Sequence, residues 1–462
     1  FDRITRPEQI LSSLPQAIQT MLDPSECGPA TISMSQDVQG EAFEYPEIFF
    51  EEKIHEIRRV HPDPNQIKRA AEKIITSNQP IIIAGGGVLY SEAEIELSNF
   101  AKKHNIPVTP TVMGIGCMTK DDPYYIGAIG CLGEGSSNSL SKDTDLALAV
   151  GTKLGDFTTG SWSNFHNKDF KLVSINTARF DVTKHLATPI VSDAKIGLKE
   201  LSKALGDWKV SNDWYDRAVK ERSEWDQYVE KQSGPTNQEL PSYAHAVGAV
   251  YRSADSSDIV VTAAGGLVGE VVQIWKPKEL NTFETEWGFS CMGYEISGAL
   301  GIKMAKPNQD IIVFVGDGSY LLNNSDIYSS VIYDKKLIIV VCDNGGHMVI
   351  NRLQLAKGGK EYLCNLKATG AKNLQFVDFE SHAKSMGANA ETVKSTSELE
   401  AAFKRAKASN KTYVISIKTH GYEWLDGTAF WESPTLEVHT TDENKKAYQE
   451  FLAGKNNQRK GV

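Results

Sequence analysis

The sequence predicts an α/β protein built from doubly wound, parallel-sheet domains. Two observations lead to this fold class. Short, continuously apolar runs recur along the chain, and polar, helix-prone stretches separate them. Such runs are typical of parallel strands that helices cover on both faces, whereas half-exposed antiparallel strands alternate between apolar and polar residues. With 462 residues, the chain is long enough for about two to four such domains.

The composition limits the kinds of partner. The chain carries 49 basic and 59 acidic residues, and a net charge of −10 argues against nucleic acid or an anionic membrane as a partner. No apolar run approaches the ~18 residues that a membrane-spanning helix needs. The six cysteines form no CxxC pair, so we expect free, buried thiols and a reducing, cytoplasmic location.

The N-terminal residues 1–45 predict too few elements for a domain. A helix is expected over residues 6–22, with Thr5 as its N-cap, and a strand over residues 28–34. A helix followed by a lone buried strand cannot complete a sheet, so we expect this part to be the end of a domain whose earlier part is absent. The following stretch is rich in Glu, Pro and His, and we place a linker at 46–64.

Residues 65–206 predict a first complete α/β domain. Helical patterns such as the one over residues 93–103 lie between its apolar runs. The expected strands are 80–84, 106–110, 145–150, 171–175 and 188–191. Residues 207–239 are polar and helix-prone up to Gly234-Pro235, and we interpret them as a connector.

Residues 240–424 predict a second α/β domain, and a C-terminal tail over 425–462 ends in a helical pattern. The expected strands are 258–262, 311–315, 337–341 and 413–417. Three of these strands end at a glycine-rich or acidic turn. Ligands bind at the carboxyl ends of parallel strands, because helix N-termini and free backbone N–H groups converge there. The three turns are Ala263–Gly266, Gly316–Ser319 and Asp343–Gly346.

The spacing of two of these turns predicts a metal site. Asn344 follows Asp317 by 27 residues, enough for one helix over about 323–333 and a return strand. A right-handed crossover then places both strand ends side by side in one sheet. A carboxylate, an amide oxygen and a nearby glycine carbonyl are hard oxygen ligands of the kind that Mg²⁺ prefers. Taken alone, the sequence Ala263–Gly266 is as consistent with a tight structural turn as with a turn that binds a phosphate.

These turns resemble the motif of the thiamine-diphosphate-dependent enzymes, which opens with Gly-Asp-Gly and closes on two Asn. The first Asn is replaced here by Asp343, and the second is kept as Asn344. The resemblance implies a Mg²⁺ site made by Asp317, Asn344 and the carbonyl of Gly346. It also implies a diphosphate site made by Gly265, Gly266, Gly318 and Ser319.

The segment Glu286–Tyr294 is similar to the stretch beneath the cofactor in this family. The resemblance implies that Met292 props the bent cofactor. It further implies that the carbonyl of Ser290 and the N–H of Met292 bond the edge of the pyrimidine ring. A core methionine is the structural alternative.

The resemblance extends over the whole chain. It implies that residues 1–45 are the C-terminal remnant of a pyrimidine-binding domain, 65–206 a central domain and 240–424 the diphosphate- and Mg²⁺-binding domain. The family takes its activating Glu from the pyrimidine-binding domain of a second subunit. We therefore expect a homodimer or homotetramer, a missing N-terminal domain of the same protein that supplies this Glu, and no activity from this fragment alone.

Longer phrases resemble one subgroup, the trihydroxycyclohexane-1,2-dione hydrolases of inositol catabolism. The phrases are 2–9, 35–42, 151–161, 290–295 and 442–453. The resemblance implies hydrolysis of a carbon–carbon bond in a cyclic diketone, opening the ring to 5-deoxyglucuronate. Four residues are candidates to form hydrogen bonds with such a substrate, and each of them also suits a structural role. They are Glu270, Glu284, His347 and Asn351.

Three alternatives stay open. A 2-oxo-acid decarboxylase or an acetohydroxyacid-synthase-like carboligase would share the fold and the cofactor. A domain that binds thiamine diphosphate without catalysis would keep the same turns. The turn Gly85–Gly87 suggests a flavin or other nucleotide, although it lacks the GxGxxG order of dinucleotide sites.

Overall fold

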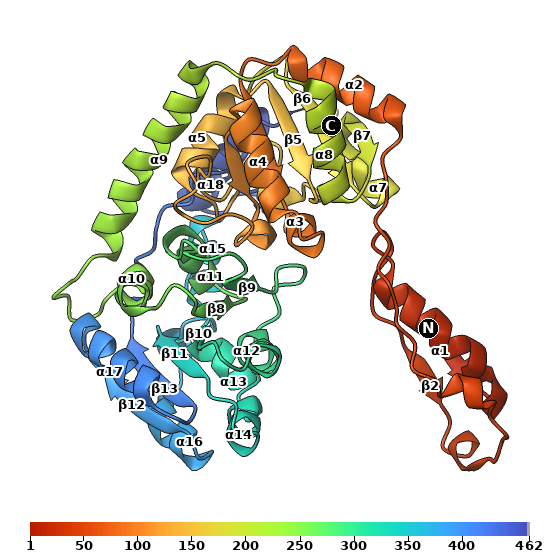
Figure 1. Cartoon of the computed structure of the whole chain (residues 1–462). Helices are drawn as coiled ribbons and strands as arrows, with labels where there is room; N and C mark the ends of the chain where they lie inside the picture. The colour runs from red at the N-terminus through yellow and green to blue at the C-terminus, as the bar shows by residue number, and fades with distance from the viewer. Residues whose placement is uncertain (460–462) are drawn as a thin grey trace.

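The computed structural model describes residues 1–459, so the last three residues of the predicted tail lie outside it. Two α/β bodies lie one above the other in Figure 1, and the N-terminal segment lies to one side of them. The long helix α9 (Asn212–Ser233) runs from the upper body toward the lower one. It ends at Gly234-Pro235, where the helical pattern of the connector was expected to end.

The upper body contains a five-stranded, all-parallel sheet with the order β4-β3-β5-β6-β7. Its strands are β3 (Pro80–Ala84), β4 (Val108–Pro110), β5 (Leu146–Val150), β6 (Lys171–Asn176) and β7 (Thr188–Val191). Every residue of β3 and β5 is buried, as expected for strands covered on both faces. Its helices are α2 (Pro64–Ile75), α3 (Gly86–Tyr90), α4 (Glu94–His104), α5 (Gly135–Asp143), α6 (Asp156–Thr159), α7 (Arg179–Val182) and α8 (Ala194–Leu205).

The lower body contains a six-stranded, all-parallel sheet with the order β12-β13-β11-β10-β8-β9. Its strands are β8 (Ile259–Thr262), β9 (Phe283–Thr285), β10 (Ile311–Gly316), β11 (Ile338–Asp343), β12 (Asn389–Val393) and β13 (Tyr413–Lys418). The two sheets confirm the predicted α/β class with parallel sheets. Strands β9 and β12 were not predicted, because both are short edge strands that mix buried and exposed residues and so contain no continuous apolar run.

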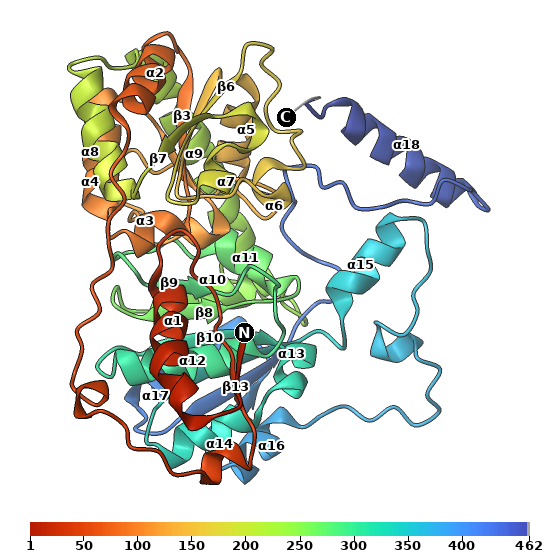
Figure 2. The same ribbon diagram turned by 90° about the vertical axis from the view of Figure 1, so that its right-hand side faces the viewer.

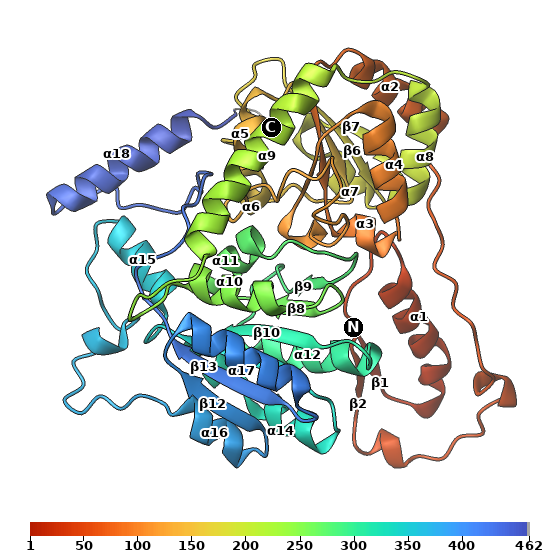
Figure 3. The same ribbon diagram turned by 60° about the vertical axis from the view of Figure 1, so that its left-hand side comes forward.

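The helices of the lower body surround this sheet, and Figure 3 shows α12 running beside β10. The helices are α10 (Tyr243–Ser253), α11 (Leu267–Ile274), α12 (Tyr294–Ala305), α13 (Asp317–Leu322), α14 (Ser325–Ile332), α15 (Met348–Ala356), α16 (Phe379–Ser385) and α17 (Thr396–Ala408). The C-terminal helix α18 (Asp442–Asn456) lies at the height of the upper body, where Arg459 shortly after it donates its N–H to the carbonyl of Trp162 at 3.0 Å. The helix expected over about 323–333 is present as α14, and the short helix α13 before it was not predicted. The two helices are separated at Asn323, whose side chain bonds Ser297 on α12 at 2.6 Å. Helices α15 and α18 project from the body in Figure 2.

The N-terminal segment differs from its prediction. Strand β2 (Ile32–Met34) is shorter than expected. It is not alone, because it pairs in parallel with β1 (Asp2–Ile4), and none of its three residues is buried. Helix α1 (Ile10–Leu22) begins later than predicted, after a 3₁₀ turn. Thr5 is not its N-cap, because Gln9 occupies that position, and the side chain of Gln9 accepts the backbone N–H of Thr5 at 2.6 Å.

Among residues 1–459, no helix is long and apolar enough to cross a membrane. All six cysteines are free, as predicted. Cys117 and Cys342 are buried, and Cys131 and Cys364 are partly buried. Cys27 and Cys291 are exposed, so the expectation that the thiols are buried was wrong for these two.

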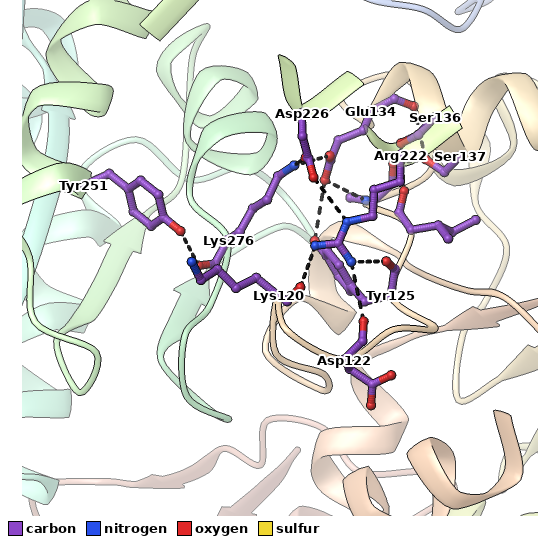
Figure 4. A network of polar contacts seen from close by, with 12 residues as sticks. Lys120, Asp122, Tyr125, Glu134, Ser136, Ser137, Arg222, Asp226, Tyr251 and Lys276 are labelled. Carbon is purple, nitrogen blue, oxygen red and sulfur yellow. Dashed lines mark hydrogen bonds and ion pairs between the residues drawn. The ribbon is translucent and has the colours of Figure 1, made fainter. Parts of the chain in front are cut away.

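A buried ionic network joins the two bodies to the connector (Figure 4). The ammonium of Lys276, just after α11, lies 3.1 Å from the carboxylate of Glu134 and also pairs with Asp226 on α9. Glu134 is fully buried in the upper body and accepts the N–H of Ala128 at 3.1 Å. Burial alone would lower the pKa of Lys276, but its two carboxylate partners raise it overall. One cation therefore ties three parts of the chain together.

We expect Lys276→Met to destabilise the protein by about 3–5 kcal/mol, because Glu134 would remain buried without its cation. Urea unfolding measures this change. In the double variant Lys276→Met/Glu134→Gln, the carboxylate is also removed, and we expect part of the stability to return. A double variant no more stable than Lys276→Met alone would contradict the importance of this pair.

Candidate functional site

Three neighbouring strands of the lower sheet end at the same edge. Strands β10 and β11 pair in parallel up to Gly316 opposite Cys342, and β8 pairs with the other side of β10. The turns that follow the three strands therefore lie side by side. They carry every residue predicted to hold Mg²⁺ or the diphosphate.

Asp317 is the first residue of α13 and is buried. Its Oδ2 accepts the backbone N–H of Gly346 at 2.7 Å, so the two metal-site turns are in direct contact. Burial, and then the negative charge of Asp343, raise the pKa of Asp317 to about 7. A buried carboxylate next to a second one is a position that a cation would stabilise.

Asp343, which replaces the first Asn of the family motif, has its own partners. Its Oδ1 accepts the N–H of Gly345 at 3.1 Å, and its Oδ2 forms an ion pair with Lys418. Lys418 is the residue opposite Asp343 in the pairing of β11 with β13. The substitution is thus compensated by a cross-strand cation, whereas Asp317 forms no ion pair with a basic side chain of residues 1–459.

Asn344 provides an independent indication of a ligand. Its Oδ1 is buried and has no hydrogen-bond partner within the part of the chain that the structure describes. Buried polar atoms are nearly always paired, so this amide oxygen, in the turn that bonds Asp317, is suited to act as a ligand of a cation. Residues 1–459 contain no group of three or more His, Cys, Asp or Glu side chains that could hold a metal. The predicted Mg²⁺ site does not require such a group, because its ligands are one carboxylate, one side-chain amide and one backbone carbonyl.

The glycines of the turns allow close approach of a ligand or of the chain itself. Gly265 has a φ of +77°, a conformation that L side chains rarely adopt, and no other atom lies near its missing Cβ. Gly266 directly precedes α11 and is its N-cap without a side-chain cap bond, and the first N–H groups of a helix are where anions bind. At Gly318 the space of a Cβ is filled by His347, whose Cε1 would lie only 2.6 Å away.

Ser319 makes contacts that were not foreseen. Its hydroxyl donates to the carboxylate of Glu295 at 2.9 Å and accepts the N–H of Gly293 at 2.8 Å. Its hydroxyl proton is therefore directed away from a ligand, and only its backbone N–H remains for the predicted diphosphate contact. Glu295 was missed in the sequence, where the one signal is an acidic residue in an otherwise apolar first turn of α12.

The loop between β9 and α12 lies beside these turns. The carboxylate of Glu286 closes the loop by accepting the N–H groups of Phe289 at 2.8 Å and Cys291 at 2.6 Å. Ser290 has a φ of +53°, and its hydroxyl donates to the carbonyl of Ala263 at 3.3 Å. Met292 is 36% exposed, so it is not a core methionine.

The four candidates for substrate contacts do not form one group. His347 lies at the site against Gly318, whereas Glu284 is exposed on the edge strand β9. Asn351 is fully buried and donates to Glu361 at 2.9 Å. Glu270 is buried on α11, where burial raises its pKa to about 7 and one oxygen accepts the N–H of Leu425 at 2.8 Å.

The turn Gly85–Gly87 has a packing explanation. A Cβ at Gly85 would lie 2.4 Å from the carbonyl oxygen of Gly151, and one at Gly87 would lie 2.6 Å from the Cα of Gly151. These glycines let the turns after β3 and β5 pack backbone against backbone. Their presence therefore needs no nucleotide.

Comparisons with known proteins agree with this geometry. Residues 67–201 match the model of the thiamine pyrophosphate enzyme central domain, and residues 263–417 match that of the C-terminal TPP binding domain. A 3D-(3,5/4)-trihydroxycyclohexane-1,2-dione hydrolase of Halalkalibacterium halodurans is 35% identical over 97% of this chain and 74% of its own length. The chain belongs to the family of thiamine pyrophosphate enzymes.

Other relatives carry the same name. A hydrolase of Lacticaseibacillus casei is 34% identical over 98% of this chain, and one of Bacillus subtilis is 32% identical over 97% of it; in both cases 74% of the relative's length is covered. The resemblance to thiamine-diphosphate enzymes and to this subgroup is thereby confirmed. Thiamine pyrophosphate is the same compound as thiamine diphosphate. The matched C-terminal model covers Gly265, Gly266, Asp317 and Asn344.

We expect Asp317→Ala to weaken the Mg²⁺-dependent binding of thiamine diphosphate by at least about 100-fold, because it removes a charged metal ligand and the bond to Gly346. Titration calorimetry with and without Mg²⁺ measures the affinity. Asp343→Asn is the matched control at the end of the neighbouring strand, and it should keep affinity within about tenfold. Affinity of Asp317→Ala equal to that of this control would contradict the site.

Proposed function

We propose that the protein is a thiamine-diphosphate- and Mg²⁺-dependent hydrolase that breaks a carbon–carbon bond of trihydroxycyclohexane-1,2-dione and opens the ring to 5-deoxyglucuronate. One observation carries the proposal: the similarity to hydrolases of this name extends over 97% of the chain, through all three turns of the site. A role in inositol catabolism and membership of the carbon–carbon hydrolases are parts of this proposal, and the similarity to these relatives supports them.

In this proposal, Mg²⁺ is held by Asp317, Asn344 and the carbonyl of Gly346. The raised pKa of Asp317 and the unpartnered oxygen of Asn344 support the assignment. The diphosphate is held by backbone N–H groups of the glycine turns and of the first turn of α13. These residues are Gly265, Gly266, Gly318 and Ser319.

The loop before α12 holds the aminopyrimidine. The partial exposure of Met292 and the left-handed conformation of Ser290 fit a loop shaped to receive a ligand. Bound there, the cofactor would supply a carbon nucleophile and an electron sink for the cleavage. The chain orients the cofactor and offers polar groups to the hydroxyls of the substrate, and His347 is the best-placed candidate for this contact.

The active form is a homodimer or homotetramer. Exposed apolar side chains on the two short helices after β10 support association with another protein surface. They are Leu321, Leu322, Tyr328, Ile332 and Tyr333, each 48–63% exposed.

We expect full-length protein, supplied with thiamine diphosphate and Mg²⁺, to consume the cyclic dione and form the ring-opened acid. Chromatography of the products measures the reaction, and omission of Mg²⁺ should abolish it. Pyruvate is the matched alternative substrate. Consumption of pyruvate without ring opening would instead identify a decarboxylase or carboligase, and cofactor binding without either reaction would identify a non-catalytic protein.

A further inference from the structure

Glu295 is a buried carboxylate that the proposed function does not use. It lies in the first turn of α12 and is 1% exposed. Burial raises its pKa, and the groups that act in the opposite direction are neutral hydrogen-bond donors. An acid in such a position is costly unless its hydrogen bonds serve the structure around it.

The donors come from three separate segments. Oε1 accepts the N–H of Ala264 at 3.3 Å, and Oε2 accepts the N–H of Gly293 at 2.8 Å. The hydroxyl of Ser319 lies 2.9 Å from both oxygens. Ser319 also accepts the N–H of Gly293, which closes a ring of bonds around the carboxylate.

Each of these segments belongs to a different part of the proposed cofactor site. Ala264 directly precedes the diphosphate glycines Gly265 and Gly266. Gly293 follows Met292 in the aminopyrimidine loop, and its φ of +94° marks the end of that loop. Ser319 lies two residues after Asp317 on α13.

We propose that Glu295 is the positioning residue that sets the diphosphate turns and the aminopyrimidine loop at the spacing one cofactor molecule requires. This inference rests on the proposed function. The carboxylate is suited to the task because two oxygens accept several hydrogen bonds at once. It also fixes the hydroxyl of Ser319, so that the backbone of Ser319 faces the diphosphate.

Glutamine is the discriminating substitution. It has nearly the same size as glutamate but offers one acceptor oxygen, and its NH₂ group would face the N–H of Ala264 or Gly293. Glu295→Gln therefore removes the arrangement of acceptors without leaving a cavity. Glu295→Asp keeps both oxygens but is one methylene shorter, so it should reach only part of the donors.

The test is titration of thiamine diphosphate with Mg²⁺ into the full chain by calorimetry, together with near-UV circular dichroism of the bound cofactor. We expect Glu295→Gln to weaken binding by about tenfold or more, as for a lost buried hydrogen bond, and to alter the cofactor band at saturation. Glu295→Asp should fall between Glu295→Gln and wild type. Ser319→Ala combined with Glu295→Gln should add little, because the hydroxyl acts through Glu295.

Glu134→Gln is the matched control, since it removes another fully buried carboxylate at the interface between the bodies. It should lower the midpoint of urea unfolding and leave cofactor affinity within about twofold. The inference is overturned if Glu295→Gln and Glu295→Asp lower only the unfolding midpoint and bind cofactor as wild type does. If Glu295→Gln does not fold, Glu295→Asp alone decides by the same criterion. Wild-type protein that binds no thiamine diphosphate would overturn the proposed function as well.

Discussion

The parallel pairing of β8, β10 and β11 is the constraint on which the site depends. Residues near 265, 317 and 344 are far apart in the chain, and they meet because three strands point the same way and end at one edge. The register of Gly316 opposite Cys342 places Asp317 level with Asp343, so the turns bond to each other through Asp317 and Gly346. A shift of this register would separate the proposed metal ligands.

Buried carboxylates at this edge are stabilised in different ways. Asp343 pairs with Lys418, and Glu295 is surrounded by neutral donors from three segments. Asp317 receives N–H groups but forms no ion pair with a basic side chain of residues 1–459, and burial together with the charge of Asp343 raises its pKa to about 7. Asp343 and Glu295 are thus stabilised by partners within the chain, whereas Asp317 lies at the proposed binding position of the divalent cation.

The sequence predicted the parts of this arrangement that depend on local pattern. Buried strands such as β3 and β10 are continuous apolar runs, and Asp317 and Asn344 stand directly after such runs. The edge strands β9 and β12 were missed because they are short or alternating. The short strand β1 was missed because its partner β2 lies 30 residues further along the chain.

The contacts of charged side chains were not predictable from local pattern. Glu295 receives Ser319 from 24 residues away and Ala264 from 31, and Lys418 reaches Asp343 across 75 residues. The ion pair of Glu134 and Lys276 joins the upper body to the lower body. Such pairs depend on how the crossover connections place the strands and helices in space. The sequence alone therefore does not distinguish these residues from charged residues on the surface.

The most direct test of the central claim is the position of the metal. Crystals grown with thiamine diphosphate and Mn²⁺ in place of Mg²⁺ would locate it by anomalous scattering. The account predicts one peak coordinated by Asp317, Asn344 Oδ1 and the carbonyl of Gly346, with the diphosphate completing the oxygen shell. A metal bound elsewhere, or a bound cofactor with Asn344 Oδ1 still unpartnered, would contradict it.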